Sequence, residues 1–260
     1  MVKDIFHSIA AAARRLFVNW VVLLISLSMY LALLGAIYLF FNIREATVAQ
    51  VTLNLILPIA AVALFFLIQA MGLSYVRIGV DAAYLLKRSL GDCWRILLAS
   101  LPVILIAWLI IYLFGKADQS FFIESGAAGS KAMKWGWGAV AVHGIQIFLI
   151  HVFLPLVTIH LWIATVREGL AAAFKGVGRV VRRALAPRSL LVYVALCAVF
   201  GATVYFLLVP YVDFKGPWTQ LWAVGIKTAL ALLLTFIGWL LTLGSIAELT
   251  TRREMKEFET

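Results

Sequence analysis

Six long apolar stretches, separated by shorter polar and basic segments, dominate the sequence. A helix needs about 20 apolar residues to cross the roughly 30 Å hydrocarbon core of a bilayer. Each of the six stretches is long enough for one crossing. The pattern therefore predicts an all-α polytopic membrane protein, a single domain over residues 1–260, with spans at 17–41, 51–76, 96–114, 138–166, 189–210 and 219–247.

Basic residues gather on alternate connections between these spans. Most of the 22 Lys and Arg residues lie at the two termini, after the second span and after the fourth. Such residues are retained on the cytoplasmic side of a membrane, so both termini are predicted to be cytoplasmic. The same distribution accounts for the net charge of +10. A nucleic-acid-binding protein would instead concentrate its charge in one soluble module, so no nucleic-acid partner is expected.

Three of the basic segments are also amphipathic at helical spacing. Their apolar faces hold Phe6, Ile9, Ala13 and Leu16, then Leu86, Leu90, Trp94 and Leu97, then Phe174, Val177, Val181 and Leu185. Their basic faces hold Arg14 and Arg15, then Lys87, Arg88 and Arg95, then Lys175, Arg179, Arg182 and Arg183. We expect each segment to form a helix that lies in the cytoplasmic interface and binds anionic lipid headgroups.

These segments precede the first, third and fifth spans, and the even-numbered spans share a pattern of their own. Each even span runs from apolar residues through small or hydroxylated residues to an exit that carries arginine. We predict three pseudo-repeated hairpins, each preceded by an interfacial helix and aligned on Arg14, Lys87 and Arg182. Gly176 and Gly178 each weaken the third helix by about 1 kcal/mol relative to alanine, and Pro187 is expected to end it.

Two of the predicted units, AAYLLKRSLGDCWRILLASLPVIL and AAAFKGVGRVVRRALAPRSLLVYV, carry a resemblance to known proteins. The chain resembles six-span bacterial proteins of the YciC type and the membrane domain attached to some glycerophosphodiester phosphodiesterases. The resemblance implies a fold and a prokaryotic inner (cytoplasmic) membrane. It does not extend to phosphodiesterase activity, because the catalytic barrel of those enzymes has no counterpart in this sequence.

The fourth predicted span carries His143, Gln146, His151 and His160. His143, Gln146 and His160 lie within about 100° of arc on an α-helical wheel. Polar residues inside a membrane are functional candidates by default. Two interpretations remain open: hydrogen bonds between helices, or a polar path through a transporter or an ABC-type permease subunit.

Charged residues are otherwise rare inside the spans. Lys227 lies within the sixth span, where its long side chain is expected to extend toward the membrane surface. Glu248 lies at the cytoplasmic end of that span, four residues before Arg252. This spacing predicts a solvated ion pair at the end of a helix.

Catalytic and cofactor-binding motifs are missing from the sequence. It has no HExxH, no GxSxG and no glycine-rich phosphate loop before a helix. Cys93 and Cys197 form no CxxC pair. EGLAAAFKG partly resembles the coupling motif of ABC importer permeases, but Phe174 and the lack of a following Leu-Pro depart from it. We therefore expect no enzyme activity, no cofactor and no metal.

The position of the charges favours an accessory or assembly subunit over a transporter. The basic residues lie on the expected surface helices, whereas the spans offer few groups that coordinate a hydrophilic solute. This favours a non-catalytic accessory or assembly subunit of a larger membrane complex. Its expected partners are anionic membrane lipids and other membrane-protein subunits. A transporter or permease subunit with a path along the fourth span is the alternative.

Overall fold

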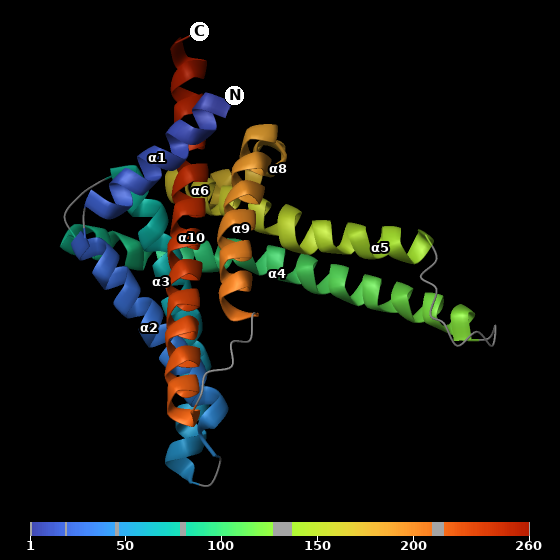
Figure 1. Ribbon diagram of the computed structural model, residues 1–260. Coiled ribbons are helices and arrows are strands. Elements are labelled where there is room, and N and C mark those ends of the chain that lie inside the picture. The colour runs from blue at the N-terminus through green and yellow to red at the C-terminus, as the bar shows by residue number, and fades with distance from the viewer. Residues whose placement is uncertain are drawn as a thin grey trace. The chain divides into compact units, whose positions relative to one another are not determined.

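The structure, a computed structural model, describes residues 2–18, 20–44, 47–78, 82–126, 137–209 and 216–259. Every regular element in these ranges is helical (Figure 1). Six segments are long and apolar enough to cross a membrane, in agreement with the predicted six spans. Helices suit this environment because each one pairs its own backbone N–H and C=O groups, which find no water in a bilayer core. The chain is an integral membrane protein.

Five of the six spans begin within three residues of the predicted positions, whereas the third begins at Tyr84, 12 residues before the predicted residue 96. They lie in α2 (Trp20–Asn42), α3 (Val48–Ile78), α4 (Ala82–Gly126), the run of α5 (Trp137–Phe148), η1 (Leu149–Phe153) and α6 (Leu154–Glu168), α9 (Pro187–Leu208), and α10 (Pro217–Glu259). Two of these helices are much longer than one crossing requires. α4 has 45 residues and α10 has 43, so each is about 65 Å long at 1.5 Å per residue.

Two of the three amphipathic segments form helices apart from the spans. The first is α1 (Val2–Val18). The third is divided at Gly176 into α7 (Leu170–Lys175) and α8 (Val177–Ala184). As predicted, the helical segment ends before Pro187, which is the first residue of α9.

The second amphipathic segment does not form a separate helix, so that prediction is wrong. Residues 82–95 are the beginning of α4 and continue without a break into the third span. The physical reason is local. The buried residues Leu85, Ser89, Asp92, Ile96 and Ala99 follow one another at spacings of three and four, so the buried stripe of the segment continues into the span in a single helical register.

The chain divides into two compact units. Unit 1 comprises Met1–Ile96 and Leu191–Thr260, and unit 2 comprises Leu97–Leu190. In unit 1, α2 and α3 pack along each other as a hairpin, and α10 packs against α3. α1 lies against the C-terminal part of α10 (Figure 1). The first and last helices of the chain are therefore neighbours.

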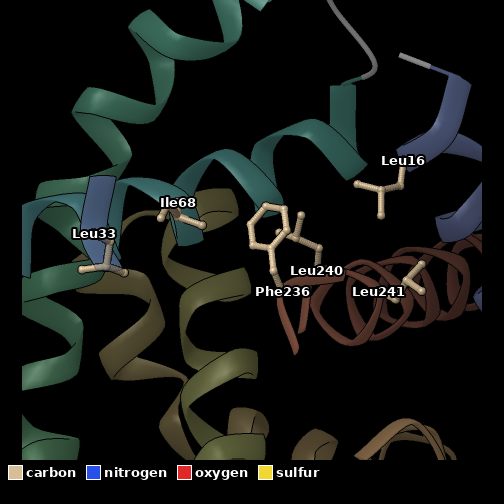
Figure 2. Close-up of a cluster of buried hydrophobic side chains, with 6 residues drawn as sticks. All are labelled: Leu16, Leu33, Ile68, Phe236, Leu240 and Leu241. Carbon is tan, nitrogen blue, oxygen red and sulfur yellow. The ribbon is translucent and has the colours of Figure 1, made fainter. Parts of the chain in front are cut away.

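A cluster of buried apolar side chains joins the helices of unit 1 (Figure 2). Its members are Leu16 from α1, Leu33 from α2, Ile68 from α3, and Phe236, Leu240 and Leu241 from α10. Tyr30 stacks on the Phe236 ring with 4.9 Å between the ring centroids. Four helices thus share one core, although many large apolar residues of α2, α3 and α10 remain exposed on their outer faces.

α9 and α10 approach closely where Gly238 faces Phe200, both within unit 1. A Cβ atom added at Gly238 would lie 2.5 Å from Phe200 Cγ and 2.9 Å from Phe200 Cβ. Phe200 Cβ is held by the backbone of α9, so the ring cannot easily move away. A small residue is required here for the two helices to come together.

We expect Gly238→Ala to lower the free energy of unfolding by about 1–3 kcal/mol, the usual cost of overpacking a filled interface. The apparent melting temperature of the purified protein in detergent measures the change. Gly201→Ala is the matched control, because Gly201 lies in α9 and an added Cβ there meets nothing within 4 Å. Equal melting temperatures for both variants would contradict the close approach.

In unit 2 the helix α6 is the central element, and residues 159–166 are buried all round. Leu161 and Ala164 pack with Ala99 of α4 and with Ala173 and Val180 of α7 and α8. The indole Nε1 of Trp162 donates a 2.8 Å hydrogen bond to Ser100 Oγ, and both side chains are buried. α6, the last part of the fourth span, thus joins α4 and the basic helices α7 and α8.

Candidate functional site

Two adjacent arginines of α1 have different environments: Arg15 contacts neighbouring helices, and Arg14 faces outward. Arg15 Nη1 lies 3.0 Å from Glu248 Oε2 of α10. The hydroxyl of Tyr75 on α3 donates a hydrogen bond to the backbone oxygen of Arg15. Arg14 is exposed, and within the described ranges it has no ion pair or hydrogen bond. Arg15 therefore fastens α1 to α3 and α10, while Arg14 is available to an external anion.

Glu248 departs from its predicted role. Its side chain is only 9% exposed and contacts Arg15, so the prediction that Glu248 is solvated is wrong. The side chain of Arg252 lies outside the described residues. Sequence spacing missed the Arg15 contact because the two partners stand at opposite ends of the chain. A buried carboxylate requires a counter-charge, and here the N-terminal helix supplies it.

The first part of α4 contains a buried acid that the sequence analysis did not single out. The Asp92 side chain is 5% exposed, and its Oδ2 lies 3.6 Å from Arg88 Nε. Its Oδ1 lies 3.4 Å from Arg95 Nη1, and Ser74 Oγ of α3 donates to Oδ2 at 3.4 Å. The spacings from Asp92 to Arg88 and Arg95 are four and three residues, a signal for helical ion pairs that was present in the sequence.

Lys87, one residue before Arg88, is exposed and makes no ion pair or hydrogen bond in the described part of the chain. Two residues earlier, Leu85 is fully buried and packs with Met71 and Tyr75 of α3. Because Tyr75 also binds the backbone of Arg15, Lys87 and Arg14 lie at the same end of unit 1. Unit 1 thus brings two of the three predicted basic segments together.

The basic residues of α7 and α8 form the corresponding surface of unit 2. Arg179 Nη1 lies 3.9 Å from Glu168 Oε2, and half of the Arg179 side chain is exposed. Lys175 and Arg182 are exposed and, among the described residues, without a hydrogen bond or ion pair. Arg183 is half-buried. Lys175 and Arg182 are therefore the cations of this unit that are open to an anion.

In all three segments the buried face is displaced by one or two residues from the predicted apolar face, except at Leu16, which belongs to both. The buried residues are Ile5, Ser8, Ala12 and Leu16, then Leu85, Ser89, Asp92 and Ile96, then Ala173, Val180 and Ala184. Of the residues predicted to enter lipid, the large ones that remain exposed are Phe6, Leu86, Leu90, Trp94, Phe174, Val177 and Leu185. Each segment therefore uses one stripe for internal packing and keeps an apolar stripe outside, beside its cations.

The polar residues of the fourth span do not share one face. η1 is a π-helical turn at residues 149–153. Such a turn holds one residue more than an α-helical turn, so it rotates the following residues by about 100°. His143 and His151 are exposed and Gln146 is half-buried, whereas His160 is buried and shares a 3.2 Å hydrogen bond with Ser189 Oγ. The single-face prediction is wrong for His160, which joins two helices.

The π-turn lies directly before a proline. In an α-helix, the carbonyl of His151 would accept a hydrogen bond from the residue four positions later, but that residue is Pro155, which has no N–H. The preceding backbone bond in the turn runs from Leu154 N–H to the carbonyl of Leu149, five residues back. The widened turn therefore lies where Pro155 removes an α-helical hydrogen bond, although Pro58 and Pro102 lie inside α3 and α4 without such a turn.

The chemistry offered by these surfaces is anion binding. Exposed guanidinium and ammonium groups donate charge-assisted hydrogen bonds to phosphate or carboxylate oxygens. Within the described ranges, no group of three or more His, Cys, Asp or Glu residues is arranged to hold a metal ion. Comparison with protein-family models, with curated proteins and with solved structures finds no match, so the resemblance to YciC-type proteins stays a prediction from the sequence.

Proposed function

We propose that this protein is a non-catalytic component of a prokaryotic inner membrane, with both termini in the cytoplasm. Its basic helices bind anionic lipid, and it supports the assembly or stability of a larger membrane complex. One observation carries the proposal: Arg14, Lys87, Lys175 and Arg182 are exposed and have no ion pair or hydrogen bond within the described residues.

Lipid is the anion that best suits these cations. Each one lies on a helix whose outer stripe carries exposed apolar residues, such as Phe6, Leu90 and Val177. A soluble anion would gain nothing from that stripe, whereas a phospholipid offers both a phosphate and an acyl chain. Attraction to an anionic membrane surface contributes about 1 kcal/mol per basic residue.

The exposed apolar faces of the spans support a role within a complex. Leu55, Ile59 and Val62 of α3 are exposed, as are Leu105, Trp108 and Leu109 of α4. In the described parts of these spans, few polar side chains interrupt the apolar surface. Surfaces of this kind contact lipid chains or the spans of other subunits, and they provide no coordination for a hydrophilic solute.

Gentle extraction from the native membrane, followed by native mass spectrometry, tests the proposal. We expect a stoichiometric complex with at least one other membrane protein, together with retained anionic phospholipid. Loss of the basic charges at Arg14, Lys87, Lys175 and Arg182 is expected to reduce the retained anionic lipid. A lone protein with no preference for anionic over zwitterionic lipid would overturn both parts of the proposal.

A transporter or permease subunit is the second candidate, and the π-turn at His151 favours it. π-turns occur frequently at functional sites, and His151 and His143 are exposed on the membrane-spanning stretch. A lone protein in the same experiment would favour this candidate over an accessory subunit.

A further inference from the structure

The three basic segments contain adjacent pairs of basic residues at equivalent positions. These dibasic pairs are Arg14–Arg15, Lys87–Arg88 and Arg182–Arg183. Aligned on their first members, the pairs have buried residues two positions before, at Ala12, Leu85 and Val180. They also have buried residues two positions after, at Leu16, Ser89 and Ala184. The three segments therefore pack in the same register, although two belong to unit 1 and one to unit 2.

The two members of each pair have different environments. The second member is turned toward the fold: Arg15 lies 3.0 Å from Glu248, and Arg88 lies 3.6 Å from Asp92. Arg183 is half-buried and also interacts with other groups of the described structure. The first members, Arg14, Lys87 and Arg182, are exposed and make no such interaction in the described ranges.

A large exposed apolar residue follows each outward cation by three positions. These residues are Phe17, Leu90 and Leu185, with 56%, 59% and 46% of their surface exposed. Residues three apart are neighbours on one side of a helix. Each pair thus presents a cation beside an apolar side chain, while its second arginine interacts with the fold.

We propose that each dibasic pair is a binding site for one anionic phospholipid, so that the chain carries three equivalent sites. The outward cation binds the phosphate, and Phe17, Leu90 or Leu185 contacts the start of an acyl chain. This inference rests on the proposed function and adds the number, position and composition of the sites. Lys87 provides a single ammonium group rather than a planar guanidinium fork, so its site is the weakest of the three.

The test counts bound lipids by native mass spectrometry after titration with phosphatidylglycerol in a phosphatidylcholine background. We expect three tightly bound phosphatidylglycerol molecules in the unmodified protein. Arg14→Gln, Lys87→Gln and Arg182→Gln are each expected to remove one molecule, and the triple variant all three. Arg44→Gln is the matched control, because Arg44 is exposed but lies outside the three segments, and it is expected to leave three.

The outcomes separate this inference from the function on which it rests. Three tightly bound phosphatidylglycerol molecules in the triple variant would overturn the site assignment while leaving anionic lipid binding intact. Equal retention of both lipids by the unmodified protein would overturn the proposed function as well. Displacement of the bound lipid by excess inorganic phosphate would show a phosphate site without an acyl-chain contact, and would also overturn the inference. Unchanged melting temperatures are expected for the three single variants, since their cations are not held by the fold.

Discussion

Arg88→Leu combined with Arg95→Leu is expected to lower the free energy of unfolding by about 2–3 kcal/mol. The double substitution leaves Asp92 with a carboxylate that is 5% exposed, and among the described residues only the Ser74 hydroxyl still donates a hydrogen bond to it. A buried charge without a counter-charge is strongly destabilising. The estimate lies below the range for fully buried pairs because the two arginine side chains are 34% and 56% exposed.

A double-mutant cycle with Asp92→Asn isolates this effect. Asparagine keeps the shape of the side chain and still accepts a hydrogen bond from Ser74, but it carries no charge. Adding Asp92→Asn to the double substitution is therefore expected to restore most of the lost stability, as measured by thermal unfolding in detergent. If the same loss remains with Asp92→Asn, it comes from the packing of the arginine stems and not from the carboxylate.

Arg15→Leu is expected to cost about 2 kcal/mol of stability, because Glu248 then loses the guanidinium 3.0 Å from its carboxylate. The loss is also expected to loosen α1 from α10, so that a protease cleaves α1 faster in the variant than in the unmodified protein. Arg14→Leu is the matched control, since Arg14 is adjacent but exposed and makes no ion pair in the described structure.

Glu248→Gln provides the complementary test. With the charge of Glu248 removed, Arg15→Leu is expected to have little further effect on either stability or cleavage. If Arg15→Leu loosens α1 equally in both backgrounds, the pair does not fasten the helix, and the apolar contacts of Ile5, Ala12 and Leu16 alone hold it in place.

The six spans could be predicted from the sequence because bilayer thickness and backbone hydrogen bonding leave few alternatives. The packing face of the amphipathic segments was harder to predict. Ser8, Ala12 and Ser89 contribute little to an apolar pattern, yet small residues let helices approach closely and are buried here. The larger Phe6 and Leu90 dominate the pattern and remain outside. Hydrophobicity therefore indicated that a face is apolar, but not which neighbour covers it.

Asp92 and Glu248 show a second limit of prediction from the sequence, which concerns contacts between helices. Asp92 follows Arg88 by four residues and precedes Arg95 by three, so its local pairs were readable from the sequence. Its burial against Ser74 depends on how α4 packs on α3, and the contact between Glu248 and Arg15 depends on the whole of unit 1. In the same way, a helical wheel placed His160 beside His143, because no wheel includes the widened turn before Pro155.

The contacts between α1 and α10 can form only late in biosynthesis. Ribosomes add roughly 5–20 residues per second, so α1 leaves the ribosome many seconds before Glu248 exists. During that interval Arg15 lacks its partner from α10, and Leu16 lacks Phe236, Leu240 and Leu241 from the cluster they later share. Unit 2 is synthesised entirely within this interval, because it lies between the two segments of unit 1. The insertion of the last helix therefore completes the assembly of unit 1, and a chain that stops before α10 leaves its first helix without its main packing surface.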